Sequence, residues 1–129
     1  MHWVETAILL LTIVLAYVYW KPWMRPAVVE TLEGNATLYF FYTDWCGHSK
    51  KAKPEWEKLM AELPATYGTT KVVGKAVNCE EDVTTCAAYS VDAYPTIKLE
   101  TSQGIVDFTQ RVTTPSLVGF LTGNLGEKA

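Results

Sequence analysis

Residues 37–50 read TLYFFYTDWCGHSK and contain the junction between a predicted strand and a predicted helix. Residues 37–42 form a continuous β-branched and aromatic run, which is typical of a strand covered on both faces of an open sheet. Across residues 47–63, apolar residues recur at nearly helical spacing with Lys and Glu between them, which predicts an amphipathic helix bent near Pro54. Cys46 is therefore expected where a central strand ends and a helix begins.

A cysteine at the start of a helix is favoured as a nucleophile. Its sulfur faces backbone N–H groups without partners and the positive end of the helix dipole, and both favour the thiolate. The thiolate attacks disulfides, and cysteines placed this way can have pKa values of roughly 3.5–7.5. We predict Cys46 as the catalytic nucleophile, the alternative being a buried, inert cysteine. Protonated His48 would stabilise the anionic sulfur further, unless it is only a solvent-facing histidine of the first turn.

The segment around this cysteine resembles a known active site. Residues 41–50 (FYTDWCGHSK) are similar to the signature of the protein disulfide isomerase family, whose usual motif is WCGHCK. The resemblance implies supporting roles for three motif residues, Trp45, Gly47 and Ser49. It covers roughly residues 27–125 and implies a thioredoxin fold, an α/β architecture in which helices flank a central mixed sheet.

Two prolines extend the resemblance. Pro54 falls at the helix-kinking position of thioredoxins, and residues 93–96 (AYPT) resemble the cis-proline segment GYPT of the family. The resemblance implies a cis bond between Tyr94 and Pro95, packed opposite Cys46 in a groove where substrate backbone binds. The alternative is an ordinary trans proline that opens the next strand.

The rest of the sequence predicts elements that complete an α/β sheet with helices on both faces. They are a second buried-type strand, a short helix, a hairpin of two strands and a final helix, at residues 71–78, 80–89, 96–101, 105–108 and 116–121. A chain of 129 residues is long enough for one ordinary domain, so we expect one site.

The sequence departs from the family pattern at two positions. Ser49 replaces the second active-site cysteine, so no disulfide can close within the motif and no resolving thiol can release a trapped partner. Phe40 stands where the family usually keeps a buried glutamate. Cys46 alone can exchange mixed disulfides and isomerise a substrate, whereas net oxidase or reductase activity is expected to be weak or absent. Arg111 aligns with a family arginine that can swing toward the active site and tune its thiols, or it is an ordinary strand-end residue.

Cys79 and Cys86 are separated by a spacing similar to that of a non-catalytic disulfide in some domains of the family. The resemblance implies that they pair in an oxidising compartment. The alternative is two reduced thiols, which is the expected state in the cytosol. Their redox state would therefore report the side of the membrane.

The N-terminal segment is apolar. Residues 7–20 carry no charge, and residues 3–23 would span about 30 Å as a helix, close to the hydrocarbon thickness of a bilayer. A cleaved signal peptide and a buried core helix are the alternatives, but bulky aromatic residues follow the apolar core and no polar stripe is present. We expect residues 1–26 to form an uncleaved transmembrane anchor and linker, and residues 27–129 to form the thioredoxin-like domain.

Two signals disagree about the side of the membrane. Lys21 and Arg25 follow the apolar span, which by the positive-inside rule favours a cytosolic domain. Residues 35–37 (NAT) form a glycosylation sequon, which is usable only in the lumen. The resemblance favours the endoplasmic reticulum or secretory pathway, and the orientation stays open.

The charge pattern limits the partners. The net charge is −3, and Lys and Arg are scattered, so nucleic acid is not an expected partner. No cofactor and no metal site are expected. The expected partners are cysteine-containing client proteins, through mixed disulfides at Cys46, and the bilayer, through residues 3–23. The hypothesis is a membrane-anchored exchange protein of the isomerase type, and the alternative is a retention, chaperone-like or structural module without turnover.

Overall fold

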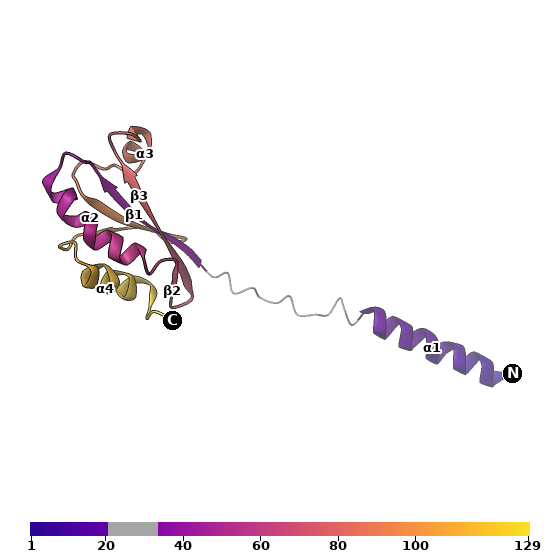
Figure 1. Ribbon diagram of the computed structural model, residues 1–129. Helices are drawn as coiled ribbons and strands as arrows, with labels where there is room; N and C mark the ends of the chain where they lie inside the picture. The colour runs from indigo at the N-terminus through magenta and orange to yellow at the C-terminus, as the bar shows by residue number, and fades with distance from the viewer. Residues whose placement is uncertain (21–33) are drawn as a thin grey trace. The chain divides into compact units, whose positions relative to one another are not determined.

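The computed structural model describes residues 1–20 and 34–129, which form two units: an N-terminal helix and a domain built on one sheet (Figure 1). Each unit is described by itself. The expected end of the membrane span at residues 21–23, the linker up to residue 26 and the expected start of the domain at residue 27 lie outside the described residues.

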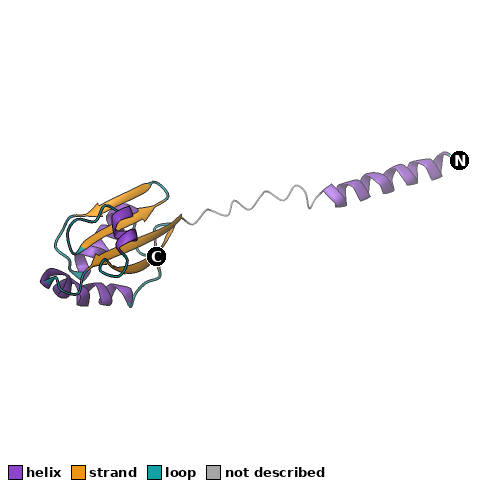
Figure 2. Cartoon of the chain, turned by 90° about the horizontal axis from the view of Figure 1, so that it is seen from above, coloured by secondary structure: helices purple, strands orange, loops and turns teal. Residues whose placement is uncertain are grey.

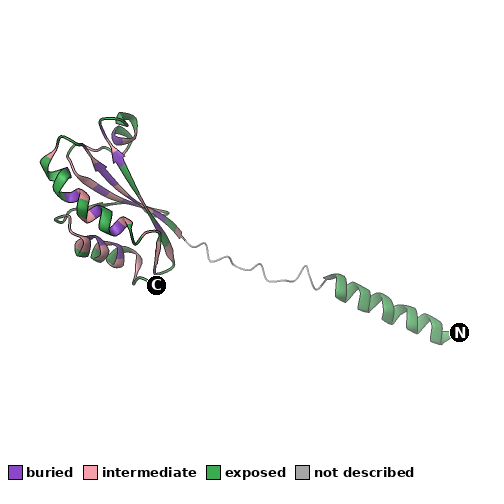
Figure 3. Cartoon of the chain, in the orientation of Figure 1, coloured by how far each residue is buried: buried purple, intermediate pink, exposed green. Residues whose placement is uncertain are grey.

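Helix α1 (His2–Trp20) is apolar on every side. Its 19 residues correspond to about 28 Å. The window His2–Tyr19 has a mean hydropathy of 1.6 and contains no buried residue, and Figure 3 shows the helix exposed along its length. The hydroxyl of Thr12 donates to the Leu9 carbonyl at 2.9 Å, so this polar group is satisfied within the helix. By length and composition α1 can cross a membrane, although a signal sequence meets the same criterion.

The second unit contains one sheet with the strands β1 (Gly34–Tyr42), β2 (Ala65–Tyr67), β3 (Thr70–Asn78), β4 (Thr96–Thr101) and β5 (Gly104–Phe108). Their order in the sheet is β2-β3-β1-β4-β5. The central strand β1 is parallel to β3 and antiparallel to β4, and both edge strands are antiparallel to their neighbours, so the sheet is mixed as predicted.

One face of the sheet is covered by α2 (Gly47–Met60) and α4 (Thr114–Leu125), as Figures 1 and 2 show. Alternate residues of β1 point into this core, and the ring of Phe40 stacks on that of Trp56 at 5.1 Å. The end of the Met60 side chain of α2 lies against Gly74 of β3, where an added Cβ would displace it. Burial of the apolar stripe of α2 therefore fixes the helix that begins at Cys46 against the central strand.

The opposite face is covered only in part, by the short helix α3 (Val83–Ala88). Phe41 and Val77 pack there with the sulfurs of Cys79 and Cys86. The prediction that β1 is covered on both faces is therefore confirmed at its carboxyl end. The prediction that β3 is a buried strand is wrong for most of its length, since Val73 is 42% exposed. The six residues of α3 are too few to cover the rest of this face.

The element bounds differ from the prediction where local capping decides them. Helix α4 begins at Thr114 rather than residue 116, because the Thr113 and Ser116 side chains form a capping box. Helix α3 begins only at Val83, where the side chain of Asp82 accepts the N–H of Thr85. The predicted hairpin of residues 96–108 is confirmed.

The edge strand β2 was not predicted, because three residues give no periodic signal. It pairs with β3 and buries the ring of Tyr67 completely. The last residues of the chain lie on its outer side. Gly68 N–H donates to the Glu127 carbonyl at 2.7 Å, and Ala129 N–H donates to the Thr66 carbonyl at 2.9 Å.

Candidate functional site

Cys46 is the N-cap residue of α2. Its backbone is extended, with φ −79° and ψ 121°, and its carbonyl accepts the N–H of Lys50 at 3.1 Å, which starts the helix. The thiol is free and partly exposed. The strand-to-helix junction predicted from the sequence therefore places this sulfur at the first turn of the helix, within reach of solvent.

The pKa of the Cys46 thiol is lowered by its surroundings. The main cause is the backbone N–H of Ser49, with smaller contributions from the backbone N–H of His48 and the hydroxyl of Ser49. Partial desolvation opposes these hydrogen bonds. All three donors belong to the first turn of α2, so they stabilise the anionic form of the sulfur that they face.

Ser49 is almost fully buried, at 2% exposure. Its oxygen accepts the N–H of Thr43 at 3.5 Å, while its hydroxyl is the donor that faces Cys46. The side chain at this position thus connects the end of β1 to the sulfur. It offers no thiol with which to attack a mixed disulfide.

The Tyr94–Pro95 peptide bond is cis and lies beside Cys46. The Cys46 thiol donates to the Tyr94 carbonyl at 3.5 Å, although the two residues are 48 positions apart in the chain. The ring of Trp45 is 66% exposed and meets the ring of Tyr94 edge to face at 6.1 Å. Only the protonated thiol can donate to this carbonyl, so ionisation exchanges that bond for those of the helix N-terminus.

A groove of about 680 Å³ opens next to these residues. It is lined by His48 from α2, by Tyr94 and Pro95, and by residues 110–113, which include Arg111. The structure therefore brings these four predicted site residues around one groove. A Cβ added at Gly47 would meet no atom within 4 Å, so packing does not require this glycine.

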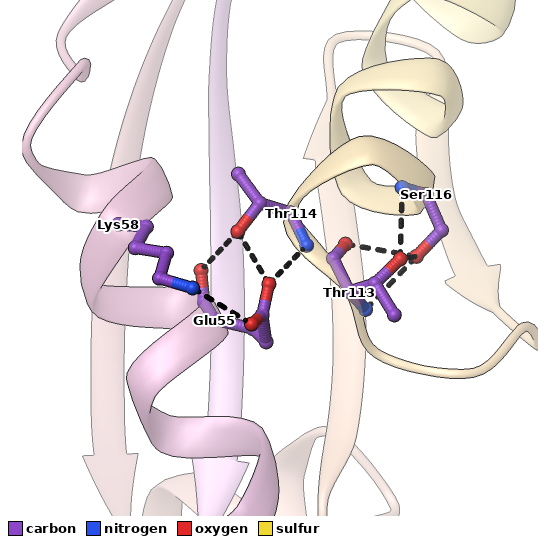
Figure 4. A network of polar contacts seen from close by, with 5 residues as sticks. All are labelled: Glu55, Lys58, Thr113, Thr114 and Ser116. Carbon is purple, nitrogen blue, oxygen red and sulfur yellow. Dashed lines mark hydrogen bonds and ion pairs between the residues drawn. The ribbon is translucent and has the colours of Figure 1, made fainter.

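A polar network joins the two helices beside the groove (Figure 4). One carboxylate oxygen of Glu55 accepts the N–H of Thr114 at 2.8 Å and its hydroxyl at 2.6 Å, and the other forms an ion pair with Lys58 at 3.0 Å. These donors, led by the Thr114 hydroxyl, lower the pKa of Glu55 to about 2. Our sequence reasoning missed this network. Residues 113–116 (TTPS) were its one local signal, since a capping Thr followed closely by Pro marks a helix start.

Phe40 places an apolar ring in the interior beside α2, at the position where the family usually keeps a buried glutamate. Its ring is fully buried between Tyr42 and Trp56. Within the described residues, the buried side chains with a polar oxygen are those of Thr43, Ser49 and Tyr67, which carry hydroxyl groups only. No carboxylate or imidazole is buried in this part of the chain to receive a proton from Cys46.

Cys79 and Cys86 form a disulfide with 5.7 Å between their Cα atoms. Both are buried with Phe41 and Val77 in the smaller core cluster. The bond joins the end of β3 to α3. It is separate from the free thiol at Cys46.

Comparison with known proteins identifies the class. The family model Thioredoxin matches residues 27–122, and the chain belongs to this family. The predicted thioredoxin fold is thereby confirmed. Relatives place the domain among the protein disulfide isomerase-like members of the superfamily.

Protein disulfide isomerase-like 2-1 of Oryza sativa subsp. japonica is 41% identical over 69 residues, covering 54% of this chain and 18% of the relative. Thioredoxin domain-containing protein 5 homolog of Drosophila melanogaster is 30% identical over 109 residues, covering 82% of this chain and 26% of the relative. The chain therefore spans about a quarter or less of the length of these relatives.

Solved structures agree on the fold. The first thioredoxin domain of mouse Protein disulfide-isomerase A4 superposes with a TM-score of 0.56 at 28% identity, covering 68% of this chain and 61% of that one. The J-Trx1 fragment of ERdj5 superposes with a TM-score of 0.59 at 26% identity, covering 70% of this chain and 41% of that one.

Proposed function

We propose that the domain exchanges thiols and disulfides in client proteins through mixed disulfides at Cys46. The observation that carries this proposal is the free, partly exposed sulfur at the N-cap of α2, where the first turn of the helix, chiefly the backbone N–H of Ser49, lowers the pKa of the thiol. A thiolate placed this way and open to solvent meets the two requirements for attack on a disulfide.

The exchange consumes no electrons. The Cys46 thiolate attacks one sulfur of a client disulfide, a new S–S bond joins enzyme to client, and the second client sulfur leaves as a thiolate. That thiolate attacks another disulfide of the same client, and the last sulfur released in this way attacks the mixed disulfide and expels Cys46. The client ends with rearranged disulfides, and the number of disulfides is unchanged.

Ser49 limits the reaction to exchange. A second cysteine would attack the mixed disulfide and leave the protein oxidised and the client reduced, but a buried hydroxyl cannot do this. Among the described residues no carboxylate is buried near Phe40, so this part of the interior has no group of that kind to take the proton of such a cysteine. Both features support isomerisation over net oxidation or reduction.

Refolding of a substrate with scrambled disulfides tests the proposal. In a buffer that contains only a catalytic amount of free thiol, the full chain should restore the activity of this substrate faster than a Cys46→Ala variant does. Equal rates for the two proteins would refute isomerisation. A Ser49→Cys variant is the matched control, because it should gain reductase activity at the same position.

Client retention is a second candidate function, favoured by the same buried Ser49. A mixed disulfide that nothing in the chain resolves persists until the client or another thiol attacks it. When free thiols are blocked with an alkylating agent in cells that express the chain, high-mass adducts of the chain that require Cys46 should then be seen. Fast turnover without such adducts would exclude retention.

We further propose that residues 1–26 are a membrane anchor and linker, with lipid contact through residues 3–23, and that residues 27–129 form a domain of the endoplasmic reticulum or secretory pathway. The apolar helix α1 supports the anchor. The Cys79–Cys86 disulfide and the resemblance to disulfide isomerases support an oxidising compartment. Extraction with alkaline carbonate tests the anchor, since an integral protein stays with the membrane pellet.

A further inference from the structure

The groove beside Cys46 has an excess of positive charge. Two cationic side chains line it, Lys51 from α2 and Arg111 from the segment before α4. Both are exposed, and across residues 1–20 and 34–129 neither has an ion pair or a side-chain hydrogen bond. Their charges therefore line the groove without a partner among the side chains of this described part.

Glu55, the one acidic residue that lines the groove, does not cancel these charges. One of its oxygens is occupied by the N–H and hydroxyl of Thr114, and the other is paired with Lys58. The carboxylate thus neutralises Lys58 and accepts the hydrogen bonds of Thr114, the first residue of α4. Lys51 and Arg111 determine the sign of the groove.

Asp44, two residues before Cys46, is exposed and accepts a hydrogen bond from Asn78 at 3.2 Å. It is not among the residues that line the groove. The groove therefore keeps the positive sign that Lys51 and Arg111 give it.

We propose that the groove is a carboxylate-binding subsite, which selects client disulfides with Glu or Asp within about three residues of the reactive cysteine. This inference rests on the proposed function. The groove reaches the sulfur through Tyr94, which lines it and whose carbonyl is 3.5 Å from the sulfur. Three residues of extended peptide span roughly 10 Å. A Glu or Asp within this distance of the attacked client cysteine can therefore lie in the groove while the cysteine lies at Cys46.

The test measures attack by the full chain, in a non-ionic detergent, on four peptides that each form a mixed disulfide with a chromophoric thiol. Three differ only in carrying Glu, Gln or Lys two residues from the cysteine, and the fourth carries Glu far from it, at the same net charge. The near-Glu peptide should react about fivefold faster than the Gln peptide at low salt, and the Lys peptide more slowly than either. The advantage should shrink as salt is raised, because these charges are exposed.

Charge-reversal variants assign the effect to the groove. The double variant Lys51→Glu with Arg111→Glu should reverse the order of the peptides, and Lys51→Gln with Arg111→Gln should abolish it. Lys50→Glu is the matched control: it lies in the same helical turn and is exposed, but it does not line the groove, so it should keep the wild-type order. Ratios between peptides cancel any change in the reactivity of the thiol itself.

Several results would overturn the inference. They are equal rates for the near-Glu, Gln and Lys peptides, equal rates for near and far Glu, and a reversal caused by Lys50→Glu. The proposed function fails separately, if no peptide reacts faster with the wild-type chain than with Cys46→Ala.

Discussion

The carboxylate of Glu55 accepts the backbone N–H of Thr114 at 2.8 Å, so a side chain of α2 satisfies the first turn of α4 across 59 positions of sequence. The same oxygen accepts the Thr114 hydroxyl. Helix α4 and the groove-lining segment before it are thereby fixed to the helix that begins at Cys46.

Acid should weaken this connection. The pKa of Glu55 is lowered to about 2 from an ordinary 4.5, so the stabilisation is fully present above pH 4.5 and is lost as the pH falls toward 2. Urea unfolding between pH 7 and pH 2.5 should show the wild-type midpoint falling toward that of Glu55→Gln. A Lys58→Ala variant, which loses only an exposed ion pair, should keep nearly the full pH dependence. Parallel curves for wild type and Glu55→Gln would contradict the assignment.

Replacing Ser49 by Ala should raise the pKa of Cys46 only in part. The hydroxyl is lost, but the backbone N–H of Ser49, which is the larger cause of the lowered pKa, remains. The pH dependence of alkylation by iodoacetamide measures the shift. A return to the pKa of a free thiol would show that the backbone donors contribute little.

Restoring the carboxylate of the family at position 40 should damage the fold. Phe40 is fully buried in an aromatic stack with Trp56, and Phe40→Glu would lose this packing and bury an acid without a partner. A loss of about 3 kcal/mol or more is expected in chemical denaturation. Phe40→Leu should cost less, because it keeps an apolar side chain. A similar loss of unfolding free energy in the two variants would contradict the expectation that position 40 cannot hold a buried acid.

Removing the Cys79–Cys86 disulfide should destabilise the domain without changing attack by Cys46. The bond closes a loop with a sequence separation of seven residues, for which chain entropy gives about 2–3 kcal/mol. The double variant Cys79→Ser with Cys86→Ser should unfold at lower urea, while its rate of reaction with a small disulfide stays near the wild-type value. A large fall in that rate would show that α3 supports the active site.

Asn35 offers a direct test of orientation. It is exposed near the start of β1, so a glycan there would not disturb the core. If the domain is lumenal, the chain made in eukaryotic cells should lose mass on treatment with a glycosidase, and Asn35→Gln should abolish that loss. A chain without glycan, together with reduced Cys79 and Cys86, would favour the cytosolic side.

The strand-to-helix junction was predictable because its signals are local. The aromatic run before Cys46 and the amphipathic repeat after it depend on neighbouring residues only, and both elements form where expected. The contact between Cys46 and Tyr94 joins distant segments, and only the likeness of two short motifs to a family suggested it. The role of Glu55 was not predictable in this way, because residues 113–116 (TTPS) indicate where a helix starts but not which distant side chain bonds to Thr114. The exposure of Val73 was not predictable either, because it depends on which helix covers that face, and α3 has only six residues.

Residues 127–129 cover one edge of the sheet, strand β2. Strand β2 is an edge, and an edge with free N–H and carbonyl groups is a template for a foreign strand. Here Lys128 forms a bridge with Tyr67, and the backbone of Ala129 is bonded to that of Thr66. These few residues occupy the outer positions that an unfolded client segment would otherwise fill. If the domain acts on partly folded clients as proposed, this border stays closed to them while the sulfur of Cys46 stays open.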